Sequence, residues 1–283
     1  MKHNISIVIA TNNPKLINIF LNNLFSNSIL PSEIIIVIPL SKEYLFNFSN
    51  KYIENIKIFK SQHENQVIQR IEGFVIAKCD YVLQIDDDII YKSEAINILL
   101  NNLKHHENAC IGPSISEKGK INTWMNNPDL FNSKLYTFIS YLNNGKKKYR
   151  SGGFSLAGIN MNFDLNLKNK YEVDWLPGGC ILHKKNNLIL DNYYPYNRGK
   201  SFSEDLFHSK EISKKGIKLF YSPDSKLFLS NQINNNLNFS SILNIIKSIK
   251  VMNIFVLRYG GNLLRLNIVL LMYYFWLFLH KLK

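Results

Sequence analysis

A short apolar segment runs directly into three carboxylates in the stretch Tyr81-Val82-Leu83-Gln84-Ile85-Asp86-Asp87-Asp88. Adjacent aspartates repel one another, so the triplet indicates that a cation binds beside it. Hard divalent cations such as Mg²⁺ and Mn²⁺ take carboxylate oxygens and complete their shell with substrate phosphates. Open α/β sheets bind nucleotides beyond the carboxyl ends of their strands, where this triplet stands. The alternative is a solvated acidic turn or the first turn of a helix, which aspartate also suits.

Segments typical of buried strands alternate with helical segments around this stretch. The pattern predicts strands at 5–10, 33–38, 56–59 and 81–85, and helices at 14–25, 64–77 and 93–103. Pro14 suits the first position of its helix, with Asn12 or Asn13 as the cap. Apolar strands that alternate with helices predict a mostly parallel sheet flanked by helices. Residues 114–170 are less regular, and we expect them to form long loops over the site. A second ordered block is expected at 172–223.

The charge and the cysteines limit the partners and the compartment. A net charge of +13 predicts an anionic partner, which is nucleic acid, acidic lipid or a phosphorylated substrate. The three cysteines are odd in number and lack the spacing of metal ligands, which favours a reducing compartment without disulfides. The chain enters a strand-like run within its first ten residues, so we expect no signal peptide.

The last 59 residues differ in composition from the rest, because no acidic residue follows Asp224. Seven cationic side chains stand among apolar and aromatic residues in this stretch: Lys226, Lys247, Lys250, Arg258, Arg265, Lys281 and Lys283. Basic helices with an apolar aromatic face lie in the membrane interface, whereas a membrane span needs about 20 apolar residues. We therefore expect an amphipathic helical extension at 231–283 that binds an anionic membrane surface. A helix packed on the core or in a dimer interface is the alternative.

Four segments resemble the inverting nucleotide-sugar glycosyltransferases of family 2, which have the Rossmann-like GT-A fold. They are residues 7–13, 66–88, 173–180 and 202–223, in the order and spacing typical of that family. Asp86-Asp87-Asp88 looks like the family's DxD motif. The run from Trp175 to Gly179 is similar to its Trp-x-x-Gly-Gly element, and Glu204-Asp205 resembles the acidic pair that carries the catalytic base.

The resemblance implies a set of site residues and a cofactor. Donor-binding residues would be Ala10, Thr11, Asn12, Gln66, Arg70, Asp86, Asp87, Trp175, Gly178 and Gly179. Asp86 and Asp88 would hold Mn²⁺ or Mg²⁺. Asp87 is either a further ligand or a partner of a ribose hydroxyl. Arg70 either contacts phosphate or holds the aspartates, and Trp175 either packs on the ligand or belongs to the core.

The catalytic prediction concerns the acidic pair. Inversion needs a carboxylate within hydrogen-bonding reach of the acceptor hydroxyl, and Asp205 is the predicted base with Glu204 as its catalytic neighbour. The alternative is ordinary capping by Ser203, with two acids that favour a helix amino terminus.

The chain departs from the family pattern at two points. No acid follows the second strand at 37–41, where many members recognise the base or ribose. No histidine follows Pro223 until His280, where many members bind metal. Both departures affect the donor site, because one removes a base contact and the other a metal ligand.

These observations predict a GT-A domain at 1–230 and a membrane-associating extension at 231–283. The expected reaction moves one sugar from a UDP-, dTDP- or GDP-sugar to a hydroxyl of a glycan acceptor that is lipid-linked, in bacterial lipopolysaccharide or capsule synthesis. The expected location is cytoplasmic, on the inner face of the plasma membrane, without nucleic acid and with a homo-oligomer as an option. The alternatives are a nucleotidyltransferase of similar fold and a non-catalytic module that binds sugar or nucleic acid.

Overall fold

The computed structural model describes residues 2–48, 56–117, 134–146, 150–164, 167–198, 201–230 and 239–281. The chain divides into two compact units. The first comprises Met1–Ile121 and Leu165–Ile233, and the second comprises Asn122–Asp164 and Asn234–Lys283. The sequence predicted one boundary, at residue 230. The second unit begins again at Asn234 and also contains the segment Asn122–Asp164, which was predicted to belong to the first domain.

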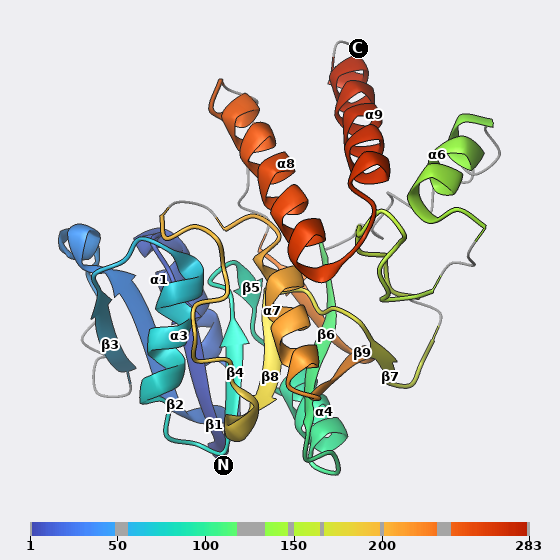
Figure 1. The fold of residues 1–283 in the computed structure, drawn as a ribbon. Helices are drawn as coiled ribbons and strands as arrows, with labels where there is room; N and C mark the ends of the chain where they lie inside the picture. Colours follow the sequence, from blue (N-terminus) through green and yellow to red (C-terminus); the bar gives the residue numbers. More distant parts are fainter. Residues whose placement is uncertain are drawn as a thin grey trace. The chain divides into compact units, whose positions relative to one another are not determined.

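A large mixed sheet forms the centre of the first unit (Figure 1). Its strands run in the order β3-β2-β1-β4-β8-β6-β9-β5, and β7 pairs with β9. The bounds are β1 Lys2–Ala10, β2 Leu30–Pro39, β3 Ile56–Ser61, β4 Tyr81–Ile85, β5 Ile89–Ile90, β6 Ala109–Glu117, β7 Tyr171–Val173, β8 Cys180–Lys184 and β9 Lys218–Leu229. Strands β1 to β4 pair in parallel, whereas β8 is antiparallel to both β4 and β6. The predicted α/β fold with a central sheet flanked by helices is confirmed. The sheet was predicted to be mostly parallel, but it is mixed, because β8, β5 and β7 add antiparallel pairs.

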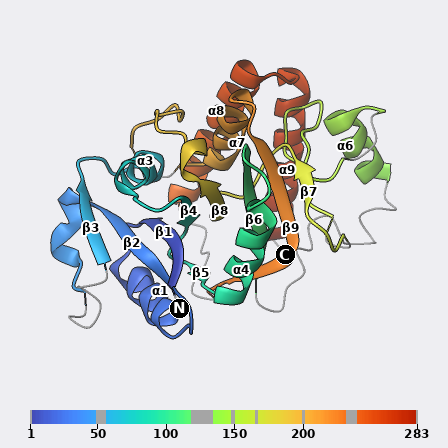
Figure 2. The ribbon, with the colours of Figure 1, turned by 90° about the horizontal axis from the view of Figure 1, so that it is seen from below.

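Helices cover both faces of this sheet (Figure 2). They are α1 Pro14–Phe25, α3 Gln66–Ile76, α4 Ser93–Leu103 and α7 Glu204–Lys214. The short 3₁₀ turn η1 Leu40–Leu45 follows β2, and the turn η2 Lys185–Asn187 follows β8. Alternate residues of a strand point to opposite faces. Ile7 therefore packs in the core with Leu21 and Leu99 of α1 and α4, while Val8 packs with Phe74 of α3.

The strand register brings three separate segments to one edge of the sheet. Val8 lies opposite Gln84 in the parallel pair β1–β4, so both strands end at the same level. Ile85 lies opposite Cys180 in the antiparallel pair β4–β8, so the residues that enter β8 meet those that leave β4. This edge, called the carboxyl edge below, therefore gathers the residues after β1, after β4 and before β8.

Most local predictions agree with the observed elements. Helices α1 and α4 have the predicted bounds, and Asn13 is the cap of α1, because its side chain accepts from the amides of Lys15 and Leu16. The prediction of long loops at 114–170 is wrong in part. Strand β6 continues to Glu117 through a register shift at Pro113, and helix α6 spans Lys134–Asn144. Proline inside a strand pattern favours an end of the strand, and here it marks a bulge instead.

The second unit is helical and contains α6, α8 Phe239–Tyr259 and α9 Leu263–Lys281. Arg265 of α9 donates to the carbonyls of Tyr141 and Leu142 at 2.9 and 3.0 Å, near the carboxyl end of α6. Asn253 and Asn267 exchange side-chain hydrogen bonds of 3.1 and 2.7 Å between α8 and α9. The predicted C-terminal helices are therefore present. Within the described ranges, no helix is long and apolar enough to cross a bilayer.

Candidate active site

The first segment of the site follows β1 at the carboxyl edge. Thr11 is buried, and its amide donates to the carbonyl of Val37 at 3.0 Å. Its hydroxyl donates to Oδ2 of Asp87, which ties the end of β1 to the triplet after β4. Ala10 is buried as well, whereas Asn12 is exposed beside them. Of these three predicted donor contacts, Asn12 is therefore the one whose side chain is most open to solvent.

The centre of the site is a buried arginine that joins two carboxylates. Arg70 projects from α3 and is 1% exposed. Its Nη2 lies 2.6 Å from Oδ1 of Asp86, and its Nη1 lies 2.5 Å from Oε1 of Glu204. Gln66, one turn earlier on α3, donates to the same Oδ1 at 3.0 Å. The carboxylates raise the pKa of Arg70 against the opposing effect of burial, so the guanidinium stays charged.

This geometry agrees with one of the two predicted roles of Arg70. The guanidinium holds the aspartate cluster, and both of its carboxylate partners are protein side chains. Asp86 is 26% exposed through its side chain, which leaves part of the carboxylate open at the edge. Buried charges need such pairing, because the desolvation of an isolated ion in the interior costs about 5 kcal/mol of free energy.

The three aspartates concentrate negative charge at the carboxyl edge. Burial raises the pKa of Asp87 to about 6, with further contributions from Asp86 and Asp88, although the bond from Thr11 lowers it. Arg70 pairs with Asp86, the first of the three. The backbone carbonyl of Asp88 accepts from the amide of Ser230 at 2.7 Å, which fixes the end of the triplet against the chain after β9.

The donor set fits a hard divalent cation in an open site. Carboxylate oxygens suit Mg²⁺ and Mn²⁺, which are commonly held by one or two carboxylates together with substrate phosphates. Within the described residues, no three side chains of His, Cys, Asp or Glu are arranged to hold a metal by themselves. One oxygen of Asp86 is already occupied by Arg70 and Gln66. Asp88 and the second oxygen of Asp86 therefore remain the predicted ligands.

The loop that enters β8 lies against the acidic pair. A Cβ on Gly178 would lie 2.2 Å from Oε1 of Glu204, so the absence of a side chain is required for this approach. The carbonyl of Gly178 accepts from Nε2 of Gln84 at 2.5 Å. The carbonyl of Gly179 accepts from the amide of Asp86 at 2.8 Å. The two glycines predicted as donor contacts are thus fixed between the triplet and α7.

Helix α7 begins with the predicted catalytic pair. Ser203 at the cap position has a left-handed backbone with φ 51°, and its side chain makes no capping hydrogen bond. Left-handed backbone at a residue other than glycine costs about 1–3 kcal/mol and clusters at functional sites. Capping by the Ser203 side chain, one half of the predicted alternative, is therefore wrong, whereas both acids do lie in the first turn of α7.

The two acids of α7 differ in their surroundings. Glu204 is buried, whereas Asp205 is half-buried, and the amide of Leu206 donates to Oδ1 of Asp205 at 3.1 Å. Burial and the neighbouring Glu204 raise the pKa of Asp205 to about 7. Burial also raises the pKa of Glu204, although Arg70 opposes this. A carboxyl group that titrates near neutral pH can accept a proton from a hydroxyl and release it again.

Trp175 belongs to the interior of the first unit. It is 7% exposed, and the next residue, Leu176, donates its amide to Oγ of Ser209 on α7 at 3.0 Å. Of the two predicted roles for Trp175, packing in the core agrees with this burial. The segment still serves the site, because it anchors the Gly178 loop to α7.

Sequence reasoning missed three buried polar residues under the site. Gln84 holds the Gly178 loop, and its sequence signal is a polar residue inside an otherwise apolar strand. Tyr193 is buried beside the carboxylate of Glu204. The ring of His208 stacks on Tyr193 with centroids 5.3 Å apart and an interplanar angle of 22°. Neither aromatic residue stands in a recognisable motif.

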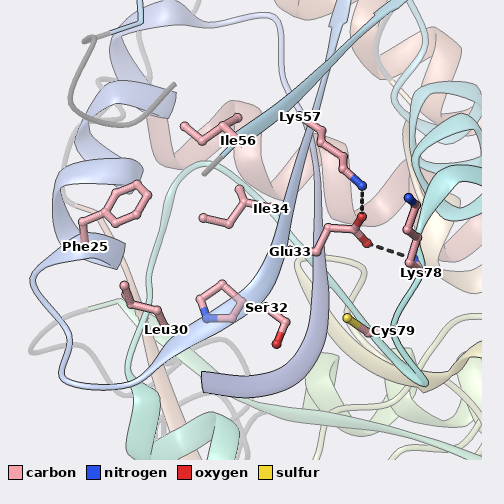
Figure 3. A pocket seen from close by; sticks show the side chains of 10 residues that line it. Phe25, Leu30, Ser32, Glu33, Ile34, Ile56, Lys57, Lys78 and Cys79 are labelled. Atoms are coloured by element: carbon pink, nitrogen blue, oxygen red, sulfur yellow. Dashed lines mark hydrogen bonds and ion pairs between the residues drawn. The ribbon is translucent and has the colours of Figure 1, made fainter. Parts of the chain in front are cut away.

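A cavity of about 400 Å³ lies at the opposite edge of the sheet, beside the amino end of β2 (Figure 3). Phe25, Leu30 and Ile34 form its apolar wall, and Glu33 forms its polar side. The carboxylate of Glu33 accepts from Ser6, from Lys57 and from the amide of Lys78. These contacts tie four segments of the fold together, and the cavity lies away from the predicted site residues.

Comparisons with known proteins agree with the geometry. The model of the family "Glycosyl transferase family 2" matches residues 6–162, which is more than half of the chain. No curated protein matches the sequence.

Two solved proteins share the architecture. GalNAc-T7, crystallised with UDP, GalNAc and Mn²⁺, aligns with a TM-score of 0.55 at 15% identity, over 87% of this chain and 48% of that one. S. aureus TarS 1–349 aligns with a TM-score of 0.53 at 13% identity, over 94% of this chain and 69% of that one. The TarS 1–349 complex with UDP-GlcNAc aligns with the same TM-score and identity, over 94% of this chain and 70% of that one. The chain thus spans about half the length of the GalNAc-T7 chain, and at these identities the likeness concerns the fold.

Proposed function

The chain belongs to glycosyl transferase family 2, and from this membership we propose that it moves one sugar from a nucleotide-diphosphate donor to a hydroxyl of a glycan acceptor, with inversion. The observation that carries the proposal is the acidic pair at the start of α7. It is joined through one buried arginine to the aspartate triplet at the carboxyl edge. The acceptor side and the donor side of such a reaction would thereby be fixed relative to each other.

Asp205 is the proposed base. Direct displacement at the sugar carbon requires that the acceptor hydroxyl lose its proton as the bond forms. The carboxylate of Asp205 is half-buried, and its pKa of about 7 lies near the pH at which a base must be both ionised and able to hold a proton. The proton passes from the acceptor oxygen to Asp205, and the bond between the sugar carbon and the diphosphate breaks.

The donor is proposed to bind along the carboxyl edge. The end of β1, the triplet and the Gly178 loop meet there, and glycine backbone allows a sugar or phosphate to approach closely. Asn12 and Asp87 are the proposed contacts to the nucleoside. GalNAc-T7 and TarS were crystallised with UDP or UDP-GlcNAc, which favours a UDP-sugar over a dTDP- or GDP-sugar.

Asp88, together with Asp86, is proposed to hold Mn²⁺ or Mg²⁺, which would stabilise the charge that develops on the departing diphosphate. The protein's own contribution is to hold the carboxylates in place. Arg70 and Gln66 hold Asp86, and Thr11 holds Asp87. GalNAc-T7 was crystallised with Mn²⁺.

The second unit supports the proposal of a lipid-linked acceptor. Leu257, Leu264 and Leu271 are each 71% exposed on α8 and α9, and Lys250 and Arg258 lie exposed on α8. Exposed leucines of this kind beside cationic residues favour an anionic membrane surface. We propose a cytoplasmic enzyme on the inner face of a bacterial plasma membrane that acts in lipopolysaccharide or capsule synthesis. The side chains of residues 275–283, which include Phe275 and Trp276, lie outside the described part.

Binding of donor tests this proposal. The melting temperature is measured against a panel of nucleoside diphosphates and their sugars, with and without Mn²⁺, because a ligand of the native state raises it by mass action. The expected result is a shift for one base that requires Mn²⁺ and is lost in Asp88→Ala. A shift independent of metal would contradict the role of the triplet. A shift with polynucleotides and none with sugar nucleotides would favour a binding module.

A further inference from the structure

The two acids at the start of α7 are placed for different tasks. Glu204 is 7% exposed, and its Oε1 is enclosed between Nη1 of Arg70 at 2.5 Å and the backbone of Gly178. Asp205 is half-buried and has no such ion pair among its described contacts. A hydroxyl of an acceptor must come within about 3 Å of its base. Glu204 is therefore poorly placed to meet an acceptor.

Arg70 is equally enclosed. Its side chain is 2% exposed, and its two ends are taken by Asp86 and Glu204. A contact with donor phosphate would require it to leave both carboxylates in the interior without a partner. The guanidinium therefore works as a rigid bridge from the donor edge to the first turn of α7.

Tyr193 lies beside the Glu204 carboxylate, whose Oε2 is buried without a hydrogen-bond partner among the described residues. It is 4% exposed, and burial together with the neighbouring Glu204 holds its pKa well above the ordinary value. It therefore stays a neutral donor. Its ring stacks on His208, which stands one turn after Glu204 on the same helix. Tyr193 thus lies against Glu204 and His208, two side chains on the same face of α7.

His208 completes this layer as a neutral ring. It is fully buried, and burial together with His183 and Arg70 holds its pKa well below the usual value. Within the described residues, neither of its ring nitrogens has a hydrogen-bond partner. Its contribution is packing against Tyr193 and against the ring of His183, whose centroid lies 5.4 Å away.

We propose that Glu204 and Tyr193 are positioning residues: the buried chain Asp86–Arg70–Glu204–Tyr193 fixes the base Asp205 to the donor edge, and Glu204 itself takes no proton from the acceptor. This inference rests on the proposed glycosyl transfer. The strained backbone of Ser203, directly before Glu204, agrees with a first turn that is held by its surroundings rather than by its own cap.

The test compares four variants in the full chain: Asp205→Asn, Glu204→Gln, Tyr193→Phe and the control Tyr194→Phe. Tyr194 is buried next to Tyr193, but its hydroxyl donates to the carbonyl of Phe202 at 2.9 Å instead of to Glu204. Donor affinity is measured by calorimetry, and kcat and KM are measured by release of nucleoside diphosphate, all well below the melting temperature of each variant.

We expect Asp205→Asn to lower kcat by roughly 1,000-fold, within the range that general bases contribute. Glu204→Gln and Tyr193→Phe are expected to lower kcat by roughly 10- to 100-fold, as misplacement of a catalytic group does, with donor affinity changed less than about 3-fold. Tyr194→Phe should keep the wild-type kcat. A loss in Glu204→Gln as large as that in Asp205→Asn would overturn the inference, and so would a wild-type kcat in Tyr193→Phe.

Failure of the proposed function gives a different result, because the wild type would then bind and cleave no sugar nucleotide. The positioning chain is still measurable in that case through stability. Glu204→Gln and Tyr193→Phe should then lower the melting temperature together by less than the sum of their separate effects, since both remove one connected contact. Additive effects would overturn the chain itself.

Discussion

Removal of the Arg70 guanidinium is the most informative perturbation of stability. Arg70→Met keeps much of the side-chain volume and leaves Glu204 and Asp86 without their cation. Their side chains are 9% and 26% exposed, so the penalty falls mainly on Glu204. Breaking a buried pair from one side costs about 3–5 kcal/mol. Gln66 keeps its hydrogen bond of 3.0 Å to Asp86, which reduces the destabilisation caused by the unpaired Asp86 carboxylate.

We therefore expect the free energy of unfolding to fall by about 4 kcal/mol at pH 8. For a unit of this size the melting temperature should fall by roughly 10 °C. The pKa of Glu204 is already raised by burial and loses its main opposing influence in the variant. A carboxyl group with a raised pKa in the folded state destabilises the fold as pH rises through that pKa. The deficit should accordingly be smaller at pH 5.5 than at pH 8.

Urea unfolding followed by circular dichroism at the two pH values measures this effect. Arg198→Met is the matched control, because Arg198 is exposed and should change stability by less than about 0.5 kcal/mol. The double variant Arg70→Met/Glu204→Gln should be more stable than Arg70→Met alone at pH 8, since it removes the uncompensated charge. A deficit below about 1 kcal/mol for Arg70→Met, or additive effects in the double variant, would refute the reasoning.

Three further predictions concern the pair, the loop and the second unit. The ratio kcat/KM should rise with pH and level off above about pH 7, because Asp205 must be ionised to act. Asp205→Asn should be more stable than the wild type at pH 8 but not at pH 4. The reason is that the raised pKa of Asp205 lowers the stability of the wild type only as pH rises through that pKa. A flat pH profile would contradict the assignment. Gly178→Ala should lose most activity, because its Cβ would lie 2.2 Å from Glu204, whereas Gly216→Ala, with nothing within 4 Å but φ +72°, should lose about 1 kcal/mol of stability and no activity. Equal activity in both glycine variants would exclude a tight fit at Gly178. The double variant Leu264→Asp/Leu271→Asp should bind less to vesicles that contain phosphatidylglycerol in a sedimentation assay. The control Leu190→Asp, which replaces another exposed leucine, should bind as the wild type does. Unchanged vesicle binding in the double variant would count against a membrane face on the second unit.

The fold was largely predictable because its signals are local. Apolar runs of strand length, Pro14 with its asparagine cap and the spacing between them gave helix α1 and strand β4 with their observed bounds. Strand β6 was not predicted, and the residues from 114 onward were expected in loops, because the bulge at Pro113 depends on pairing with β9, about 110 residues later. Such pairing leaves no mark in a local window.

The site was predictable as a set of residues but not as a set of contacts. The triplet and the acidic pair stand out in the sequence because clustered carboxylates have no use in folding alone. That one arginine joins Asp86 to Glu204 follows only from the way α3, β4 and α7 pack. Tyr193 and His208 were not predicted for the same reason. From the sequence alone a buried aromatic residue is assigned to the hydrophobic core, and only the structure shows that it lies beside a charged group.

Turnover of a sugar nucleotide tests the central claim most directly. Release of nucleoside diphosphate is measured with the donor that raises the melting temperature most, in the presence of a mixture of glycans and extracted lipid-linked glycans. The account predicts release by the wild type and a loss of roughly 100-fold or more in Asp205→Asn, with donor affinity unchanged. No release from any sugar nucleotide that binds, or equal release by wild type and Asp205→Asn, would contradict it.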